Sequence, residues 1–174
     1  MARTQESPGA QLQTLWVRLS PFPGGRWFFN KILGWKIPYK GGLGARILTF
    51  EPGHVKVQLR ERRAVRNHLQ SIHAIALANL GELTTGLALV GAMPESIRGI
   101  LVGLDVSYTK KARGTIESEA TCEIPEVCEP MDYWVNAKIR DNSGDIVAEI
   151  RAHWRLGPVP VSYTHLTLPT ILLV

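Results

Sequence analysis

Glu82 is the residue of this chain best placed for acid–base or nucleophilic chemistry. From Ala74 to Met93 it is the only charged side chain, and its neighbours are almost all apolar or small. A buried carboxylate is costly unless it is paired or solvated, and no Lys or Arg on the same segment can pair with it. Either a cation on a neighbouring strand or a wet edge relieves this cost, or Glu82 lines a ligand pocket as a base or nucleophile. We favour the interpretation that Glu82 lines a ligand pocket.

The segment that carries Glu82 predicts a helix over about residues 73–90, ending near Gly91. It is apolar on nearly every side, so it is either buried in a core or spans a membrane. Its length could just cross a bilayer. Glu82 and Asn79 near its middle, with half-polar strands following, favour a core helix and no membrane span.

Alternation of apolar and polar residues predicts strands in the second half of the chain and just before the helix. The predicted strands are 45–50, 54–60, 100–108, 116–122, 133–139 and 146–154. Such alternation is typical of an antiparallel sheet with one wet face, and the run from Asp141 to Gly144 predicts a hairpin turn. Before the strands, apolar residues recur at helical spacing over residues 11–33, and residues 21–25 divide this segment into two predicted short helices. Residues 35–43 are predicted to be a connector. The predicted class is α+β, a curved antiparallel sheet wrapped around a buried central helix with an N-terminal helical extension.

The composition is that of an ordinary globular protein with a modest basic excess. The 174 residues are 45% hydrophobic and 20% charged, with a formal net charge of +5. That charge fits a polyanionic ligand, and no Lys/Arg run argues for nucleic acid as a partner. Cys122 and Cys128 are too few for a disulfide framework and lack metal-ligand company, so we expect neither a metal nor a cofactor. The first residues carry no secretory pattern, which favours the cytoplasm.

The chain is expected to divide into three parts. Residues 1–10 are predicted to be a disordered leader, 11–156 a single domain, and 157–174 a tail of doubtful origin. The run over 161–174 resembles translated adapter sequence of the kind found at the end of genes recovered from metagenomes. It is therefore left out of the functional interpretation.

A resemblance to a known family becomes specific around the start of the predicted helix. Asn67 lies six residues before His73, and Glu82 lies nine residues after it. This spacing resembles the signature of hotdog-fold thioesterases of the phenylacetate-pathway type. The resemblance covers about residues 12–156, and its N-terminal part resembles the extension of an uncharacterised branch grouped with tetrameric acyl-CoA thioesterases.

The resemblance implies hydrolysis of acyl-CoA thioesters. Glu82 would activate water or attack the thioester carbonyl itself. Asn67 would orient the water or the carbonyl, and His73 would cap or orient the start of the helix, or act directly in catalysis as a base. The backbone N–H groups of Ala74 and Ile75 would polarise the thioester oxygen with the positive end of the helix.

Three positions differ from the family signature. Gln70 stands where the family usually has Gly, and Ala74 and Ile75 replace two glycines that follow the histidine. The bulk of Ile75 would limit how closely a substrate approaches the backbone there.

A basic segment further along the chain resembles the family's loop that meets the CoA phosphates. It comprises Lys110, Lys111, Arg113 and the adjoining Gly114. An arginine there could bind a phosphate through two parallel hydrogen bonds. The plainer interpretation of the same residues is a solvated hairpin turn.

Helix geometry predicts that the site is shared between two chains. At a rise of about 1.5 Å per residue, Glu82 lies roughly 13 Å along the helix from His73. One chain cannot bring both to the same carbonyl, whereas an antiparallel partner helix can. We therefore expect a homodimer, which could pair again into a dimer of dimers.

Two other functions stay open at this point. The first is a hotdog protein that binds acyl-CoA or lipid without turnover, which the replacements at Gln70 and Ile75 would suit. The second is a β-hydroxyacyl dehydratase, because His68 precedes Glu82 by fourteen residues. The Pro- and Gly-rich loop that such dehydratases place between the two residues is absent from the sequence.

Overall fold

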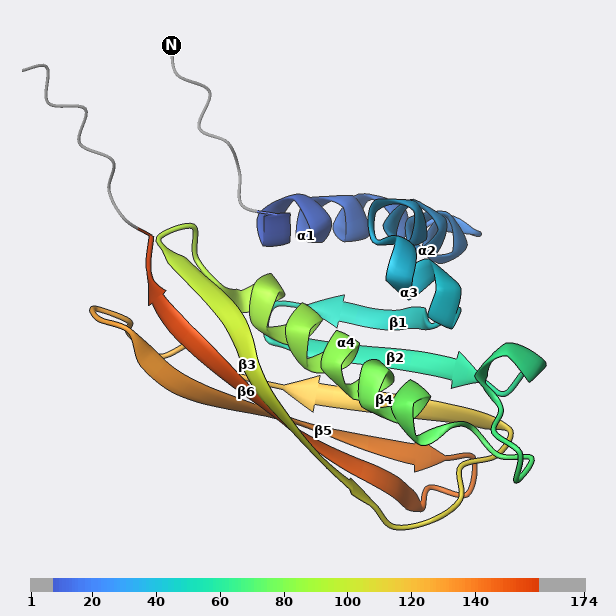
Figure 1. Ribbon diagram of the computed structural model, residues 1–174. Helices are drawn as coiled ribbons and strands as arrows, with labels where there is room; N and C mark the ends of the chain where they lie inside the picture. Colours follow the sequence, from blue (N-terminus) through green and yellow to red (C-terminus); the bar gives the residue numbers. More distant parts are fainter. Residues whose placement is uncertain (1–7, 160–174) are drawn as a thin grey trace, which may run out of the picture.

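The computed structural model describes residues 8–159, in which six strands form one antiparallel sheet (Figure 1). The strand order is β1-β2-β4-β5-β6-β3, with the central helix α4 lying across one face of the sheet. The elements are α1 (Pro8–Leu19), α2 (Gly25–Lys36), α3 (Pro38–Leu43), β1 (Arg46–Glu51), β2 (His54–Arg60), the 3-10 turn η1 (Arg63–Val65), α4 (Ala74–Ala92), β3 (Ile97–Tyr108), β4 (Thr115–Thr121), β5 (Met131–Asp141) and β6 (Ile146–Pro158). The predicted class and architecture are confirmed.

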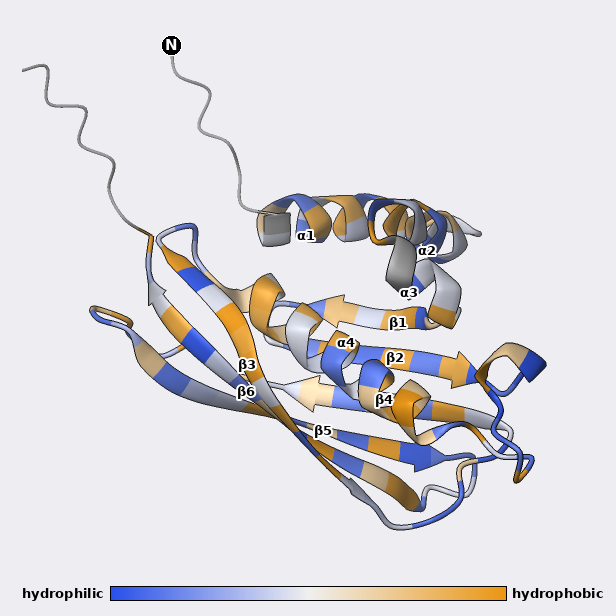
Figure 2. Ribbon diagram, viewed as in Figure 1, coloured by the Kyte–Doolittle hydropathy of each residue, from blue (hydrophilic) through white to orange (hydrophobic). Residues whose placement is uncertain are grey.

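The strands form where the sequence alternates, because every second side chain leaves the solvent. Along β2 the residues Val55, Val57 and Leu59 are buried, and their neighbours stay partly exposed. Figure 2 shows the same alternation as orange and blue bands along β2 and β6. The predicted β5–β6 turn also forms, with Asp141 Oδ1 accepting the N–H groups of Ser143 and Asp145.

The predicted connector over residues 35–43 is wrong in part, because most of it is helical. α2 continues to Lys36, and α3 begins at Pro38, where the missing N–H of proline is no loss. Gly44, with φ 71°, ends α3 in the left-handed conformation. The ordered elements also pass the predicted domain limits, since α1 begins at Pro8 and β6 ends at Pro158. The rest of the predicted leader and tail lies outside the described residues.

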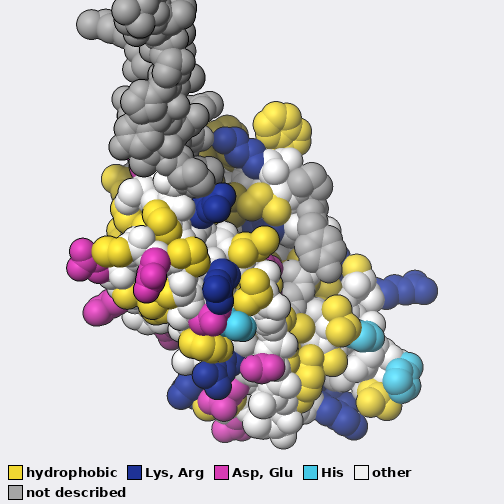
Figure 3. Space-filling view, turned by 60° about the vertical axis from the view of Figure 1, so that its left-hand side comes forward, with side chains coloured by type: hydrophobic (Ala, Val, Ile, Leu, Met, Phe, Trp, Pro, Cys, Tyr) yellow, Lys and Arg dark blue, Asp and Glu magenta, His cyan; other side chains and the backbone are white. Residues whose placement is uncertain are grey.

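The two edges of the sheet are treated differently. At β1, the side chain of Asn30 on α2 accepts the Ile47 N–H (2.8 Å) and donates to the Ile47 carbonyl (3.1 Å), as a neighbouring strand would. At β3, no strand of the described chain covers the outer edge, and Ile100 and Val102 are 65% and 53% exposed. Figure 3 brings the left-hand side of Figure 1 to the front, and on this face hydrophobic side chains lie among charged ones. An open apolar strand edge is a template for pairing with another chain.

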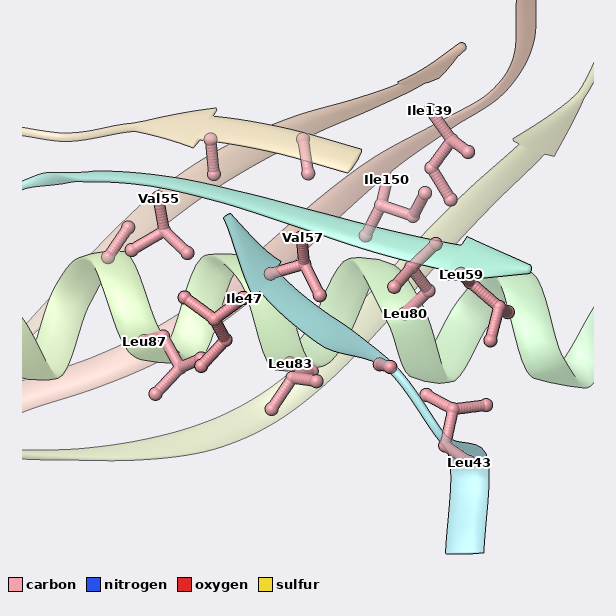
Figure 4. Packing of buried hydrophobic residues seen from close by; sticks show 14 of the residues in the cluster. Leu43, Ile47, Val55, Val57, Leu59, Leu80, Leu83, Leu87, Ile139 and Ile150 are labelled. Atoms are coloured by element: carbon pink, nitrogen blue, oxygen red, sulfur yellow. The ribbon is translucent and has the colours of Figure 1, made fainter. Parts of the chain in front are cut away.

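α4 is the core helix that its composition predicted. It is long and apolar enough to cross a membrane, but its leucines pack into the fold. Figure 4 shows Leu80, Leu83 and Leu87 of α4 among side chains of β1 and β2. Close approach requires Gly81, since a Cβ there would lie 2.3 Å from Ile150 Cγ1 on β6. The sheet thus holds one face of α4 and leaves the face with Ile75, half-buried Asn79 and Glu82 less covered.

Candidate active site

Glu82 lies in the middle of α4 on its less covered face, and it has no cation. The side chain is half-buried, and no described residue forms an ion pair or hydrogen bond with its carboxylate. Burial alone therefore raises the pKa of the Glu82 carboxyl above its ordinary value. The alternative of a cation on a neighbouring strand finds no support among residues 8–159. The result is a carboxylate more basic than usual, which suits proton abstraction.

Trp154 on β6 forms one wall beside Glu82, and sequence reasoning did not find it. A Cβ placed on Gly86 would be 3.5 Å from the six-membered ring of Trp154 and 3.8 Å from Glu82 Oε1, so the three positions adjoin. Gly86 therefore lies between the indole ring and the carboxylate. Its buried Nε1–H has no hydrogen-bond partner in the described part of the chain. The alternation of β6 predicts that Trp154 is buried, but not which helix residue it meets.

His73 caps the start of α4, which is one of the two roles predicted for it. Its Nδ1 accepts the Ile75 N–H at 3.1 Å. One of the two predicted oxyanion donors, the Ile75 N–H, is therefore already engaged. The Ala74 N–H has no partner within residues 8–159, which leaves it available at the positive end of the helix.

Asn67 organises the loop before the helix. Its Oδ1 accepts hydrogen bonds from Leu69 N (2.9 Å), Ser71 N (3.2 Å) and Ser71 Oγ (3.2 Å). Gln70, inside this turn, has φ 55° and is the one non-glycine residue of the described chain with a positive φ. That conformation is the physical reason for the glycine of the family signature at this position. The Asn67 Nδ2 group donates to no residue between 8 and 159, which leaves it available to a water or a carbonyl.

A cavity of about 580 Å³ opens beside the start of α4. Its wall includes two predicted residues, His73 and Ile75, together with Arg66 and Asn79, which sequence reasoning did not assign to the site. Asn79 lies three residues before Glu82 on the helix, so the cavity reaches within one turn of the carboxylate without including it. The Ile75 side chain is 63% exposed and stands over this opening.

The basic loop between β3 and β4 is clasped to the loop that carries Asn67. The Ile72 N–H donates to the Ala112 carbonyl (2.8 Å), and Arg113 Nε donates to the Gln70 carbonyl (3.3 Å). The Gly114 N–H donates to Glu61 Oε2 at 2.6 Å, and this bond is the main reason why the pKa of Glu61 lies below its ordinary value. The fold therefore brings the predicted phosphate loop next to the start of the helix.

The cations of this loop are not equivalent. Lys110 Nζ lies 2.6 Å from Asp141 Oδ2 and 2.5 Å from Asp145 Oδ2, so two carboxylates neutralise it and raise its pKa. Lys111 and Arg113 are exposed and form no ion pair in the described chain. Lys111 Nζ and the Arg113 nitrogens other than Nε are therefore the groups of this loop that could meet an anion. Within residues 8–159 no cluster of His, Cys, Asp or Glu could hold a metal ion.

The sequence profile of a family described as "Domain of unknown function (DUF4442)" matches residues 25–156. The chain belongs to this family. No curated protein matches it significantly. The family match runs from the start of α2 to Leu156 in β6, so it includes Glu82, strands β1 to β5 and all but the last two residues of β6.

Solved structures show the fold. A Pseudomonas aeruginosa protein of unknown function, described as "Probable Thioesterase", is 24% identical over 75% of this chain and 93% of its own, with a TM-score of 0.69. A thioesterase of Staphylococcus aureus subsp. aureus Mu50 is 15% identical over 70% of this chain and 99% of its own (TM-score 0.62). A phenylacetic acid degradation-related protein of Ralstonia eutropha JMP134 is 16% identical over 68% and 89% (TM-score 0.59). The chain therefore has the hotdog fold, as the signature around Asn67 predicted.

Proposed function

We propose that this chain hydrolyses acyl-CoA thioesters to a free acid and CoA, with Glu82 as general base or nucleophile. The observation that carries the proposal is the carboxylate itself, which is half-buried on a core helix, unpaired among the described residues and raised in pKa by desolvation. Holding such a group costs stability, and a catalytic role explains why it is there. The thioesterase descriptions of two structural relatives supply the reaction class.

A homodimer would complete the site. On the β1 edge Asn30 occupies the Ile47 N–H and carbonyl, whereas the β3 edge exposes Ile100 and Val102, so β3 is where a second copy would add its own sheet. Two-fold pairing there would also set the less covered faces of the two α4 helices against each other. Glu82 of one protomer would then lie near the helix start of the other. Association of two such dimers stays a prediction.

The proposed chemistry begins when the Glu82 carboxylate takes a proton from water and the water oxygen attacks the thioester carbonyl carbon. The resulting oxyanion would accept the N–H of Ala74 of the partner subunit. Collapse breaks the C–S bond, and the CoA sulfur recovers the proton from Glu82. In the nucleophilic variant, Glu82 attacks the thioester carbonyl carbon and expels CoA as the thiolate, which takes a proton from water. Water then hydrolyses the mixed anhydride to the free acid and the Glu82 carboxylate.

The CoA moiety would lie along the clasped loops. Lys111 and Arg113 are the exposed cations available for its phosphates, while Lys110 keeps its two aspartates. Gly114 shapes this loop by adopting φ 70°. Asn67 would hold the loop in place through Oδ1 and offer Nδ2 to the reacting water or carbonyl. Because Cys122 and Cys128 are both free thiols, we propose a reducing, cytoplasmic setting.

One observation favours binding without turnover as a second candidate. The Ile75 N–H is engaged by His73, and the exposed Ile75 side chain stands over the cavity at the helix start. Both features reduce the space and the donors available to a tetrahedral oxyanion. A protein with these features could hold an acyl-CoA without hydrolysing it.

The test is thiol release from acyl-CoAs of aromatic, short and long chain, comparing the full-length protein with Glu82→Ala and Glu82→Gln. Glu149→Gln, an exposed glutamate on β6, is the matched control. We expect turnover that falls by at least about 100-fold in both Glu82 variants and is unchanged in the control. Acyl-CoA binding by calorimetry without any turnover would establish the binding protein instead. In a single turnover in ¹⁸O-labelled water, label in the Glu82 carboxylate would establish the nucleophilic route, because it requires water to attack the Glu82 carbonyl of the anhydride.

A further inference from the structure

The outward face of α2 carries large aromatic side chains around a lysine. Trp27, Lys31 and Trp35 follow each other at four-residue spacing and so share one face of the helix, with Phe28 beside them. Trp27 is 58% exposed, Phe28 52% and Trp35 82%, while the opposite face of α2 packs into the core. Lys31 Nζ lies 5.5 Å from the centre of the Trp27 ring. Monomeric proteins rarely leave such a cluster in water without a partner.

The charge of this region has one sign. Residues 7–50 contain no Asp or Glu, although the chain as a whole has 15 of them. The same residues contain six basic side chains: Arg18, Arg26, Lys31, Lys36, Lys40 and Arg46. The helical extension α1–α3 therefore has a positive field that nothing within it neutralises, and it fits an anionic partner.

A cavity of about 520 Å³ adjoins this face between α2, α3 and β1. Trp27, Lys31, Lys40 and Arg46 line it, and no acidic residue does. Lys40 is 4% exposed, and its Nζ donates to the backbone and side-chain oxygens of Asn30 at 3.2 and 3.1 Å. These neutral acceptors leave the ammonium charge uncompensated, and burial lowers the pKa of Lys40 to about 8. An anion in this cavity would supply the missing charge.

We propose that the α1–α3 extension docks on the surface of an anionic phospholipid bilayer. In this arrangement Trp27, Phe28 and Trp35 enter the boundary between headgroups and acyl chains, and Lys31, Lys40 and Arg46 receive a lipid phosphate. Tryptophan next to lysine and arginine on one helix face is the composition of helices that lie in a membrane interface. The aromatic face lies on the α1–α3 extension, beside β1, and β3 forms the opposite edge of the sheet, so docking leaves the β3 edge free.

The experiment is co-sedimentation of the full-length protein with vesicles. One set is phosphatidylcholine alone, and the other contains about 30% phosphatidylglycerol, both at about 0.15 M salt. We expect at least tenfold stronger partitioning onto the anionic vesicles, weakening at higher salt. Lipids brominated in the acyl chain should quench the tryptophan fluorescence of the bound protein.

Two variants separate this surface from the rest of the molecule. Trp27→Ala combined with Trp35→Ala removes exposed rings, and Lys31→Glu reverses an exposed charge, so neither disturbs the core. Each is expected to lower partitioning about tenfold or more, with an unchanged circular dichroism spectrum. Trp134→Ala removes a 42% exposed tryptophan from β5 and is the matched control, expected to bind like the wild type.

Three results would overturn the proposal. The first is equal binding to neutral and anionic vesicles, or none to either. The second is unchanged partitioning of the Trp27/Trp35 and Lys31 variants. The third is evidence that this face binds another partner. That evidence would be self-association that the Trp27/Trp35 variant abolishes, or binding to a single-stranded oligonucleotide in preference to vesicles.

Discussion

Glu82→Gln is expected to abolish hydrolysis and to stabilise the protein at the same time. The carboxylate has no described cation or hydrogen-bond donor, so its ionised form is held in the fold at a cost. Glutamine has the same shape and no charge to desolvate. Because Glu82 is only half-buried and water screens it, we expect a gain in the free energy of unfolding of about 1 kcal/mol or less at pH 8.

The gain should depend on pH in a defined direction. Burial raises the folded-state pKa of Glu82 above the unfolded value near 4.5, so the folded state binds the proton more tightly. Below the unfolded pKa both states are protonated and the carboxyl costs nothing. As pH rises from that value through the raised folded pKa, the wild type loses stability, and above it the full cost is present. The glutamine variant lacks this loss, so its advantage should appear at pH 8 and vanish at low pH.

Urea unfolding at one fixed protein concentration, at pH 4 and pH 8, measures the difference, with Glu149→Gln as the exposed control. Thiol release on the same samples should fall by about 10²–10⁴-fold for Glu82→Gln. A variant that is less stable than the wild type by 1 kcal/mol or more at pH 8 would refute the idea of an unpaired carboxylate. Full activity in the variant would refute its role as a base.

Three further changes test other parts of the structure. Gly81→Ala would place a Cβ 2.3 Å from a β6 side chain and should lower the free energy of unfolding by about 1–3 kcal/mol. In the matched Gly86→Ala variant the nearest atom lies at 3.5 Å, so urea unfolding should show no change or a gain of up to about 1 kcal/mol. Equal losses in the two variants would contradict the packing argument. Gln70→Gly removes a side chain from φ 55° and should raise stability by up to about 1 kcal/mol by calorimetry, while a loss would mean that the glutamine side chain is needed. In thiol titration at pH 8, exposed Cys128 should react at least about tenfold faster than half-buried Cys122, because burial raises the pKa of Cys122 to about 11. Equal rates would contradict the burial of Cys122.

The placement of Glu82 creates a conflict between stability and function. The helix around it is among the most buried elements of the fold, and a neutral residue at this position would suit that environment better. Gly86 leaves room beside the carboxylate, and burial raises the carboxyl pKa. The same features that destabilise the ionised group adjust its basicity, so the proposed activity and the stability cost have one origin.

The sequence alone was enough to identify the core helix, the alternating strands and Glu82 as the unusual residue. Periodicity reports directly which side chains leave water, and a single charge in an apolar run is visible without any structure. The spacing of Asn67, His73 and Glu82 also led to the hotdog fold, because the loop and helix that it describes are local. The one error in the predicted elements, the connector that contains α3, arose because its glycines resemble a linker and a short helix leaves little periodicity.

Only the tertiary structure decided which distant groups meet. Lys110 is neutralised by Asp141 and Asp145, so a cation that the sequence presents as free is already occupied. Asn30 occupies the Ile47 backbone groups on the β1 edge, whereas no described residue range adds a strand to the β3 edge. Local patterns determine how much of each side chain leaves water, whereas hydrogen bonds and ion pairs depend on long-range register, which only the packed sheet establishes.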